Sequence, residues 1–330
     1  MSATAPEARQ WHWENAAAGG TAGFATVAVM HPLDVVRTRF QVNDGRVSHV
    51  PNYKNTVHAI FTIARSEGLR GLYAGFLPGV IGSTISWGLY FFFYDKAKQR
   101  YARNREDTLS PGLHLASAAE AGGLVCLCTN PVWLVKTRLQ LQTPLHQTRP
   151  YYGIFDAFRT IMREEGFRAL YRGIVPGLFL QVSHGAVQFT AYEELRKVIV
   201  DIKHRGSKRH LQNPDDLLVQ FLVSSSLKEG SIFLCPCLVE HDGSIFDSML
   251  ACSFFFQVMR SRLQQRPSAD GVPRYVDSWH VVKETARYEG VRGFYRGITP
   301  SLLKNVPASS VTFIVYENVL KLLKLARRND

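Results

Sequence analysis

The sequence predicts a helical protein built as a threefold repeat, because two short sequence blocks each occur three times at a constant separation. The first block reads HPLDVVRTRFQ from His31, PVWLVKTRLQ from Pro131 and FFQVMRSRLQ from Phe255. The second reads EGLRGLYAG, EGFRALYRG and EGVRGFYRG, and its first glycine follows Pro32, Pro131 and Phe255 by 36, 35 and 35 positions. Self-similarity at a fixed long period indicates a repeated architecture. The expected units are 10–103, 109–201 and 215–325.

Aligning the three copies of the first block places side chains of one kind in register. One register holds the cations Arg37, Lys136 and Arg260, and a second holds Arg39, Arg138 and Arg262. A third register holds glutamines in all three copies, Gln41, Gln140 and Gln264. The acidic position that precedes the first cation is less regular, because it reads Asp34, Trp133 and Gln257.

Blocks of the form Pro-x-Asp/Glu-x-x-Lys/Arg, followed by Glu-Gly and an aromatic-x-Gly, resemble the mitochondrial carrier family over nearly the whole chain. Within that family, SWGLYFFFYDKAKQRYAR, NPVWLVKTRLQLQTPLHQT and PASSVTFIVYENVLKLL are most similar to folate-transporting members of the plant chloroplast envelope. The resemblance implies an all-α membrane protein with two transmembrane helices and a short surface helix in each repeat. It also implies a six-helix bundle around a central cavity that moves one solute by alternating access.

Composition is compatible with this expectation. The chain is 46% hydrophobic with a formal net charge of +12, and it has no stretch of twenty uninterrupted apolar residues. A carrier accounts for this, since each helix turns one face to lipid and another to a wet cavity where charges are tolerated. The basic excess suits anionic lipid headgroups and an anionic solute. No helix-turn-helix, zinc-finger or RNA-binding signature is present, so nucleic acid is not an expected partner.

The sequence does not predict an enzyme, a cofactor or a metal site. It contains no nucleophile–base pair, paired carboxylates or phosphate-binding loop, and its five cysteines form no metal-ligand spacing with histidines. The N-terminus lacks the apolar core of a signal peptide, so we expect internal targeting. The resemblance implies a monomer in the chloroplast envelope membrane, with the mitochondrial inner membrane as the alternative.

The first repeat shows the expected elements in order. A helix from Trp13 to Gln41 contains the small-residue pair Gly19 and Gly23 and should continue, kinked, through Pro32. A short amphipathic helix over 53–67 should lie along the membrane surface, with one apolar face formed by Val57, Ile60, Phe61 and Ala64. The second long helix should span Leu77 to Arg100.

The resemblance implies a gate at each end of the cavity. On the matrix or stromal side, the acidic position of one repeat pairs with the basic position of a neighbour. Only Asp34 is acidic here, so at most one full ion pair is expected, with Lys136 or Arg260. The remaining positions of this inner gate are Arg37, Trp133 and Gln257. The outer gate should contain Asp95, Lys98, Glu193, Arg196 and Glu317, and it is irregular because the third basic residue comes one place late, at Lys321.

The resemblance also indicates where the solute binds, nine residues after the aromatic residue of each second block. This count reaches Gly82, Leu180 and Lys304, and the neighbouring positions that share these faces are Ser86, Trp87, Tyr90, Gln181, His184 and Gln188. Lys304 matters most, because a cation at mid-membrane depth is costly and is retained mainly for an ion or solute.

One cation, several neutral polar groups and two aromatic rings suit a solute with a carboxylate and a flat heteroaromatic ring. Folate has both, and the folate-type likeness of whole segments favours it. Carriers of FAD, NAD or other nucleotides are the alternative, because those solutes offer rings and phosphates. Trp133 does not discriminate between the two groups.

The repeat spacing breaks before the third copy. Pro32 to Pro131 spans 99 positions, whereas Pro131 to Phe255 spans 124, a surplus of about 25. The anomalous segment, 215–255, lies where the fifth helix is expected and includes several charged residues and Pro236. It is either an insertion with an irregular fifth helix or non-homologous sequence, such as a retained intron, that would give a non-transporting product.

Overall fold

The computed structural model describes residues 13–43, 51, 53–102, 111–144, 149–182, 243–267 and 273–329, and every regular element in that part of the chain is helical. The first two units contain α1 (Trp13–Val42), α2 (Thr56–Leu72), α3 (Phe76–Ala102), α4 (Pro111–Leu141), α5 (Ile154–Glu164), the 3₁₀ helix η1 (Phe167–Tyr171) and a helix over 174–182. The third contains α8 (Gly243–Leu263), α9 (Ser278–Glu289), the 3₁₀ helix η2 (Val291–Tyr295) and α10 (Ile298–Asn329).

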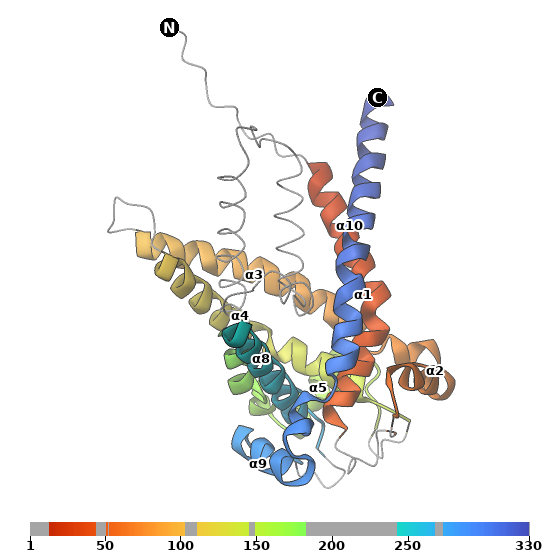
Figure 1. The fold of residues 1–330 in the computed structure, drawn as a ribbon, viewed down its shortest axis with the longest axis vertical. Helices are drawn as coiled ribbons and strands as arrows, with labels where there is room; N and C mark the ends of the chain where they lie inside the picture. Colours follow the sequence, from red (N-terminus) through yellow and green to blue (C-terminus); the bar gives the residue numbers. More distant parts are fainter. Residues whose placement is uncertain are drawn as a thin grey trace.

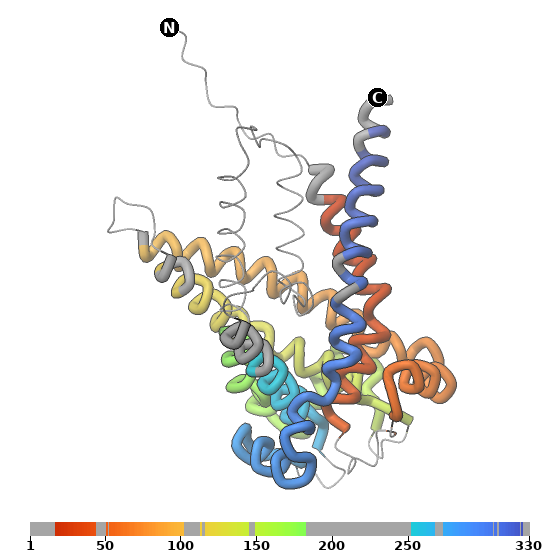
Figure 2. The backbone as a smooth tube through the Cα atoms, in the orientation of Figure 1, coloured from red at the N-terminus to blue at the C-terminus, as the bar shows by residue number. Residues whose placement is uncertain are grey.

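The long helices pack in pairs, and one pair joins the first helix of the described chain to the last. α1 lies along α10, and α3 lies along α4 (Figure 1). The same pairing is visible in the backbone tube, where the first and last helices run side by side (Figure 2). A hydrogen bond of 2.7 Å between the hydroxyls of Thr26 and Thr312 joins α1 to α10. α1 also contacts α4 and α8, so it touches helices from all three sequence units.

The helices of the first unit agree with the prediction to within a few residues. α1 continues through Pro32 to Val42, and α3 ends two residues beyond the expected Arg100. α2 runs further than the predicted 53–67 because its last turn continues beyond Gly68, which has a non-helical backbone at φ 69°. The apolar residues of α2 lie on two sides of the helix rather than on one face. Ala59 is buried against α1, whereas Phe61 is 69% exposed and faces outward, where we expect lipid headgroups.

Two described segments, Phe76–Tyr101 and Ala116–Leu141, are long and apolar enough to cross a membrane by length and composition. They belong to α3 and α4, which pack on each other. Neither property distinguishes a membrane span from the core helix of a soluble protein.

Three buried ion pairs connect the two sequence blocks, and we call them the Arg–Glu ring. The arginine of the second register pairs with the glutamate of the same unit's second block: Arg39 with Glu67 at 2.5 Å, Arg138 with Glu165, and Arg262 with Glu289 at 2.5 Å. All three arginine side chains have no exposed surface. A buried cation requires such a partner, because an unpaired charge removed from water is strongly destabilising.

The same arginines also join each unit to the next. The Nε atom of Arg39 donates to the carbonyl of Gln140 at 3.0 Å, that of Arg138 to Gln264 at 3.2 Å, and that of Arg262 to Gln41 at 3.1 Å. The three contacts run in cyclic order, from the first unit to the second, the second to the third, and the third to the first. The registers aligned in the sequence therefore occupy equivalent places in space.

The first and last glycine of each second block adopt a backbone conformation that favours glycine. All six positive-φ glycines of the described chain lie in these blocks: Gly68, Gly75, Gly166, Gly173, Gly290 and Gly297. The last glycine of each block also lets the backbone approach the neighbouring unit. A Cβ atom on Gly75 would lie 2.9 Å from the carbonyl oxygen of Lys136, and one on Gly297 would lie 3.1 Å from that of Arg37.

Gly75→Ala is expected to destabilise the protein more than Gly68→Ala. Both substitutions place a Cβ in the left-handed region, at φ 72° and 69°, which costs about 1–2 kcal/mol. Gly75→Ala adds a clash with the backbone of α4, whereas nothing lies within 4 Å of a Cβ on Gly68. Thermal unfolding of the two purified variants in detergent measures the difference, and equal losses would contradict this account of the close approach.

Candidate functional site

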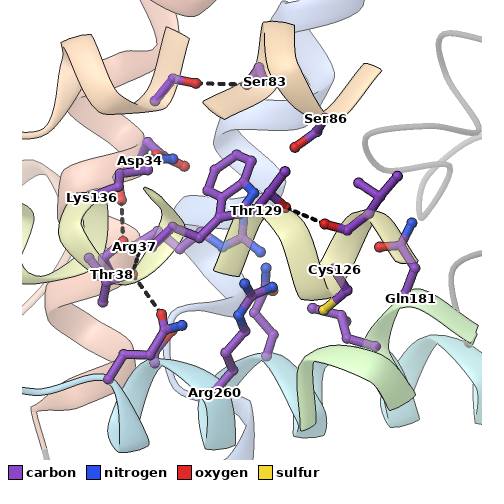
Figure 3. Close-up of a pocket in the computed structure, with 18 of the residues that line it drawn as sticks. Asp34, Arg37, Thr38, Ser83, Ser86, Cys126, Thr129, Lys136, Gln181 and Arg260 are labelled. Atoms are coloured by element: carbon purple, nitrogen blue, oxygen red, sulfur yellow. Dashed lines mark hydrogen bonds and ion pairs between the residues drawn. The ribbon is translucent and has the colours of Figure 1, made fainter. Parts of the chain in front are cut away.

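A cavity of about 870 Å³ lies between α1, α3, α4, the helix 174–182, α8 and α10. Its described lining includes the cations Arg37, Lys136, Arg260 and Lys304, with Asp34 as the acidic residue among them. Figure 3 shows Arg37, Lys136 and Arg260 around one space, each on a different helix. Four cations facing one carboxylate give this lining a positive charge, which favours an anionic solute.

Asp34 is the centre of the inner end of this cavity. Its Oδ2 atom lies 2.7 Å from Nζ of Lys136, and its Oδ1 atom lies 3.1 Å from Nζ of Lys304. Of the two partners that the sequence left open for the gate, the structure brings Lys136 to Asp34. The second partner, Lys304, was predicted to contact the solute instead. The expectation of one full ion pair therefore needs extending, because a single carboxylate holds two lysines.

Hydrogen bonds orient the Asp34 carboxylate. Gln140 donates from Nε2 to Asp34 Oδ2 at 3.1 Å, and its own Oε1 accepts from the hydroxyl of Thr38 at 2.8 Å. Lys136 also lies over the ring of Trp133, with Nζ 5.0 Å from the ring centroid. The carboxylate thus accepts from donors on two helices, Lys136 and Gln140 of α4 and Lys304 of α10.

The remaining inner-gate positions also face the cavity. Arg37, Trp133, Gln257 and Arg260 are all lining residues, so the structure gathers this predicted set in one place. Arg260 donates from Nη2 to the side-chain oxygen of Asn130 at 3.2 Å. Of the two positions that lack an acid in the sequence, Trp133 lies beside the cation Lys136, and Gln257 lines the cavity.

Most residues predicted to contact the solute line the same cavity: Ser86, Trp87, Tyr90, Leu180, Gln181 and Lys304. The rings of Trp87 and Tyr90 lie 5.9 Å apart in an edge-to-face arrangement, giving the α3 wall an aromatic surface. Among the described residues, the buried hydroxyl of Ser86 has no hydrogen-bond partner. Gly82 instead lies at the contact of α3 with α4, where a Cβ would come within 3.2 Å of Val132.

Other predicted positions are away from this cavity or outside the described chain. Asp95, Lys98 and Glu317 are not among the lining residues, and Lys321 reaches Glu317 at 3.5 Å on the exposed side of α10. The residues His184, Gln188, Glu193 and Arg196 lie outside the described residues. The outer gate therefore stays a prediction.

Sequence reasoning missed the Arg–Glu ring and the contact between Lys304 and Asp34. The ring had a signal, since Arg39–Glu67, Arg138–Glu165 and Arg262–Glu289 are separated by 28, 27 and 27 positions. Nearly equal separations of opposite charges in three repeats indicate a contact that recurs in each repeat, but they are apparent only after the blocks are aligned. The pair of Lys304 and Asp34 joins residues that are 270 positions apart, and no periodicity connects them.

Comparison with known proteins identifies the fold family. The family model for mitochondrial carrier proteins matches three segments, residues 9–105, 107–203 and 248–326. Together these matches cover most of the chain. They also coincide with the three copies of the sequence blocks, because each match contains one first block and one second block.

Individual relatives cover almost the full length. The chain is 69% identical over 318 residues to the folate transporter 1, chloroplastic, of Arabidopsis thaliana, covering 96% of this chain and 97% of the relative. It is 36% identical to the nicotinamide adenine dinucleotide transporter 1, chloroplastic, of the same plant, over 94% of this chain and 91% of that one. A mitochondrial nicotinamide adenine dinucleotide transporter of Saccharomyces cerevisiae is 32% identical over 92% of this chain and 75% of its own length. The chain therefore belongs to the mitochondrial carrier protein family.

Proposed function

We propose that this chain transports folate across the chloroplast envelope membrane by alternating access. The observation that carries this proposal is the 69% identity, over 96% of the chain, to a chloroplastic folate transporter. Nicotinamide adenine dinucleotide carriers are much more distant, at 36% and 32% identity. Transport of NAD, FAD or another nucleotide is the second candidate, with the mitochondrial inner membrane as the alternative location.

The cavity chemistry supports a folate. A folate carries glutamyl carboxylates at one end and a flat pterin ring at the other, and the cavity offers lysines and arginines together with Trp87 and Tyr90. Stacking of aromatic side chains on flat rings is energetically favourable, and lysines and arginines form strong charge-assisted hydrogen bonds to carboxylates. The proposed contacts are Ser86, Trp87, Tyr90, Leu180, Gln181, His184, Gln188 and Lys304, with Gly82 giving the close approach of α3 to α4.

We propose that Lys304 couples solute binding to the inner gate. Lys304 holds Asp34 Oδ1 at 3.1 Å, so a solute carboxylate that binds this lysine competes with Asp34 for it. Asp34 then keeps Lys136 as its main cation, and the contact between α1 and α10 at this level is weakened. A ligand shifts an equilibrium between states only by its differential affinity for them. Because the solute competes with Asp34 for Lys304, it binds more tightly to the state in which the Lys304–Asp34 contact is broken.

We also propose the finer architecture of the bundle. The repeats are 10–103, 109–201 and 215–325, each with two transmembrane helices and a surface helix in contact with lipid, and the protein acts as a monomer. The cyclic contacts of the Arg–Glu ring support three equivalent units. The third family match begins at residue 248, so most of the anomalous 215–255 segment lies outside the matched sequence, as an insertion or non-homologous sequence would.

Uptake into liposomes containing the complete chain tests the function. We expect saturable uptake of labelled folate that unlabelled folate inhibits and that equal concentrations of NAD or FAD leave nearly unchanged. Liposomes without protein provide the baseline. Uptake of NAD or FAD with no folate uptake would reject folate in favour of the second candidate. No uptake of any of the three from folded, inserted protein would indicate that the 215–255 segment makes a non-transporting product.

A further inference from the structure

Arg260 is a cation of the cavity whose described side-chain partner is neutral. It lies on α8 and, in Figure 3, extends from that helix into the space shared with Ser86 and Gln181. Its Nη2 atom donates to Asn130 Oδ1 at 3.2 Å. Within the described ranges, no acidic side chain lies within 4 Å of the guanidinium, whereas Lys136 in the same register has Asp34 at 2.7 Å.

The cyclic order of the repeats explains this difference. Asp34 of the first unit pairs with Lys136 of the second, and the Arg–Glu ring contacts follow the same direction around the bundle. Trp133 occupies in the second unit the position that Asp34 occupies in the first. By the same cyclic order, the residue at this position would pair with the cation of the third unit, Arg260. A tryptophan stands where a carboxylate would neutralise this arginine.

In the described part of the chain, the guanidinium makes one side-chain hydrogen bond, the one to Asn130. An arginine has five N–H donors in a planar fork that fits a carboxylate in bidentate geometry. Its other neighbours are small and weakly polar: a Cβ on Gly177 would lie 3.5 Å from Arg260 Cζ and 3.3 Å from the sulfur of Cys126. A cation at this depth in a membrane protein is costly unless an anion accompanies it.

We propose that Arg260 binds a second carboxylate of the solute, so that the carrier selects solutes with two carboxylates. The solute completes the charge pairing that Trp133 does not provide. Lys304 and Arg260 then share the glutamyl group of a folate between them, one carboxylate each. This inference rests on the proposed function, and it assigns to a gate position a role in specificity.

Pteroate provides the comparison that isolates this role. It has the same ring system as folate and ends in one benzoate carboxylate, because it lacks the glutamyl group. In the unmutated carrier, folate should therefore inhibit labelled-folate uptake far more strongly than pteroate. Arg260→Gln should raise the half-saturating concentration of folate about tenfold or more, the effect of a lost charged hydrogen bond. The inhibition constant of pteroate should change less than about twofold, because pteroate already lacks the second carboxylate.

Trp133→Asp is the second variant, and it leaves Arg260 in place. It supplies an internal carboxylate at the position expected to pair with Arg260. The arginine then has an anionic partner without the solute carboxylate. We expect the same loss of preference for folate over pteroate. Arg159→Gln, which removes one positive charge from the exposed side of α5, is the matched control and should leave both constants unchanged.

The outcomes separate the inference from the proposed function. Equal losses for folate and pteroate in Arg260→Gln, or no loss for either, would overturn the role of Arg260 while folate transport stands. If Trp133→Asp keeps the preference for folate over pteroate, the role of Arg260 is overturned as well. This second test remains valid if Arg260→Gln fails to fold. Absence of folate uptake by the unmutated chain would overturn the proposed function and, with it, this inference.

Discussion

Glu165→Gln is expected to destabilise the carrier by about 3–5 kcal/mol, the cost of breaking a buried ion pair by removing one partner. The side chain of Arg138 has no exposed surface, and Glu165 is its carboxylate partner through two hydrogen bonds. Glu165 also accepts from Arg172 at 3.0 Å. The substitution keeps the shape of the side chain but leaves two guanidinium groups without their negative charge.

The neighbouring residue provides the control. Glu164 is 55% exposed and pairs with Arg266 at 3.2 Å, so Glu164→Gln should cost less than about 1 kcal/mol, as for other surface pairs. Thermal unfolding of both variants in the same detergent measures the contrast between adjacent glutamates. Equal destabilisation of the two would show that the Arg–Glu ring does not hold this end of the bundle together.

Lys304→Ala is expected to lower folate uptake efficiency by at least about 30-fold, because truncating one partner of a buried charge pair costs about 2 kcal/mol or more. The loss should appear mainly as a higher half-saturating folate concentration. The fold should tolerate the change, since Asp34 retains Lys136 at 2.7 Å. Initial rates over a range of folate concentrations in liposomes measure both parameters.

Lys283→Ala is the control for this experiment, because Lys283 is an exposed lysine on α9 that is not among the described residues lining the cavity. It should transport folate as the unmutated chain does. If Lys304→Ala keeps the original half-saturating concentration and changes only the maximal rate, Lys304 acts on the gate alone. The solute contact proposed for it would then be wrong.

The helices of the first unit were predictable from sequence to within a few residues, because the two blocks lie near their ends. The pattern from Trp13 through Pro32 to Gln41 has the length and the registers of one continuous helix, and α1 follows it to Val42. The glycines of the second block mark the positive-φ turns that separate the surface helices from the long ones. These features are local, and local patterns are what one sequence displays.

The inner end of the site was predictable only in part. Alignment placed Asp34, Lys136 and Arg260 in the gate, but it left open which cation Asp34 would hold. The choice depends on how α1, α4, α8 and α10 pack, and contact between such distant helices leaves no periodic signal. For the same reason Lys304 was read as a solute contact alone, although it also holds Asp34.

An experimental structure of the complete chain with folate bound in lipid tests the central claim most directly. The claim is that cations of the cavity between α1, α3, α4, α8 and α10 bind the glutamyl carboxylates. The account predicts folate density in this cavity, with one carboxylate at Lys304, a second at Arg260, and the Lys304–Asp34 distance longer than 3.1 Å. Folate bound elsewhere, or in the cavity with its carboxylates away from both cations, would contradict it.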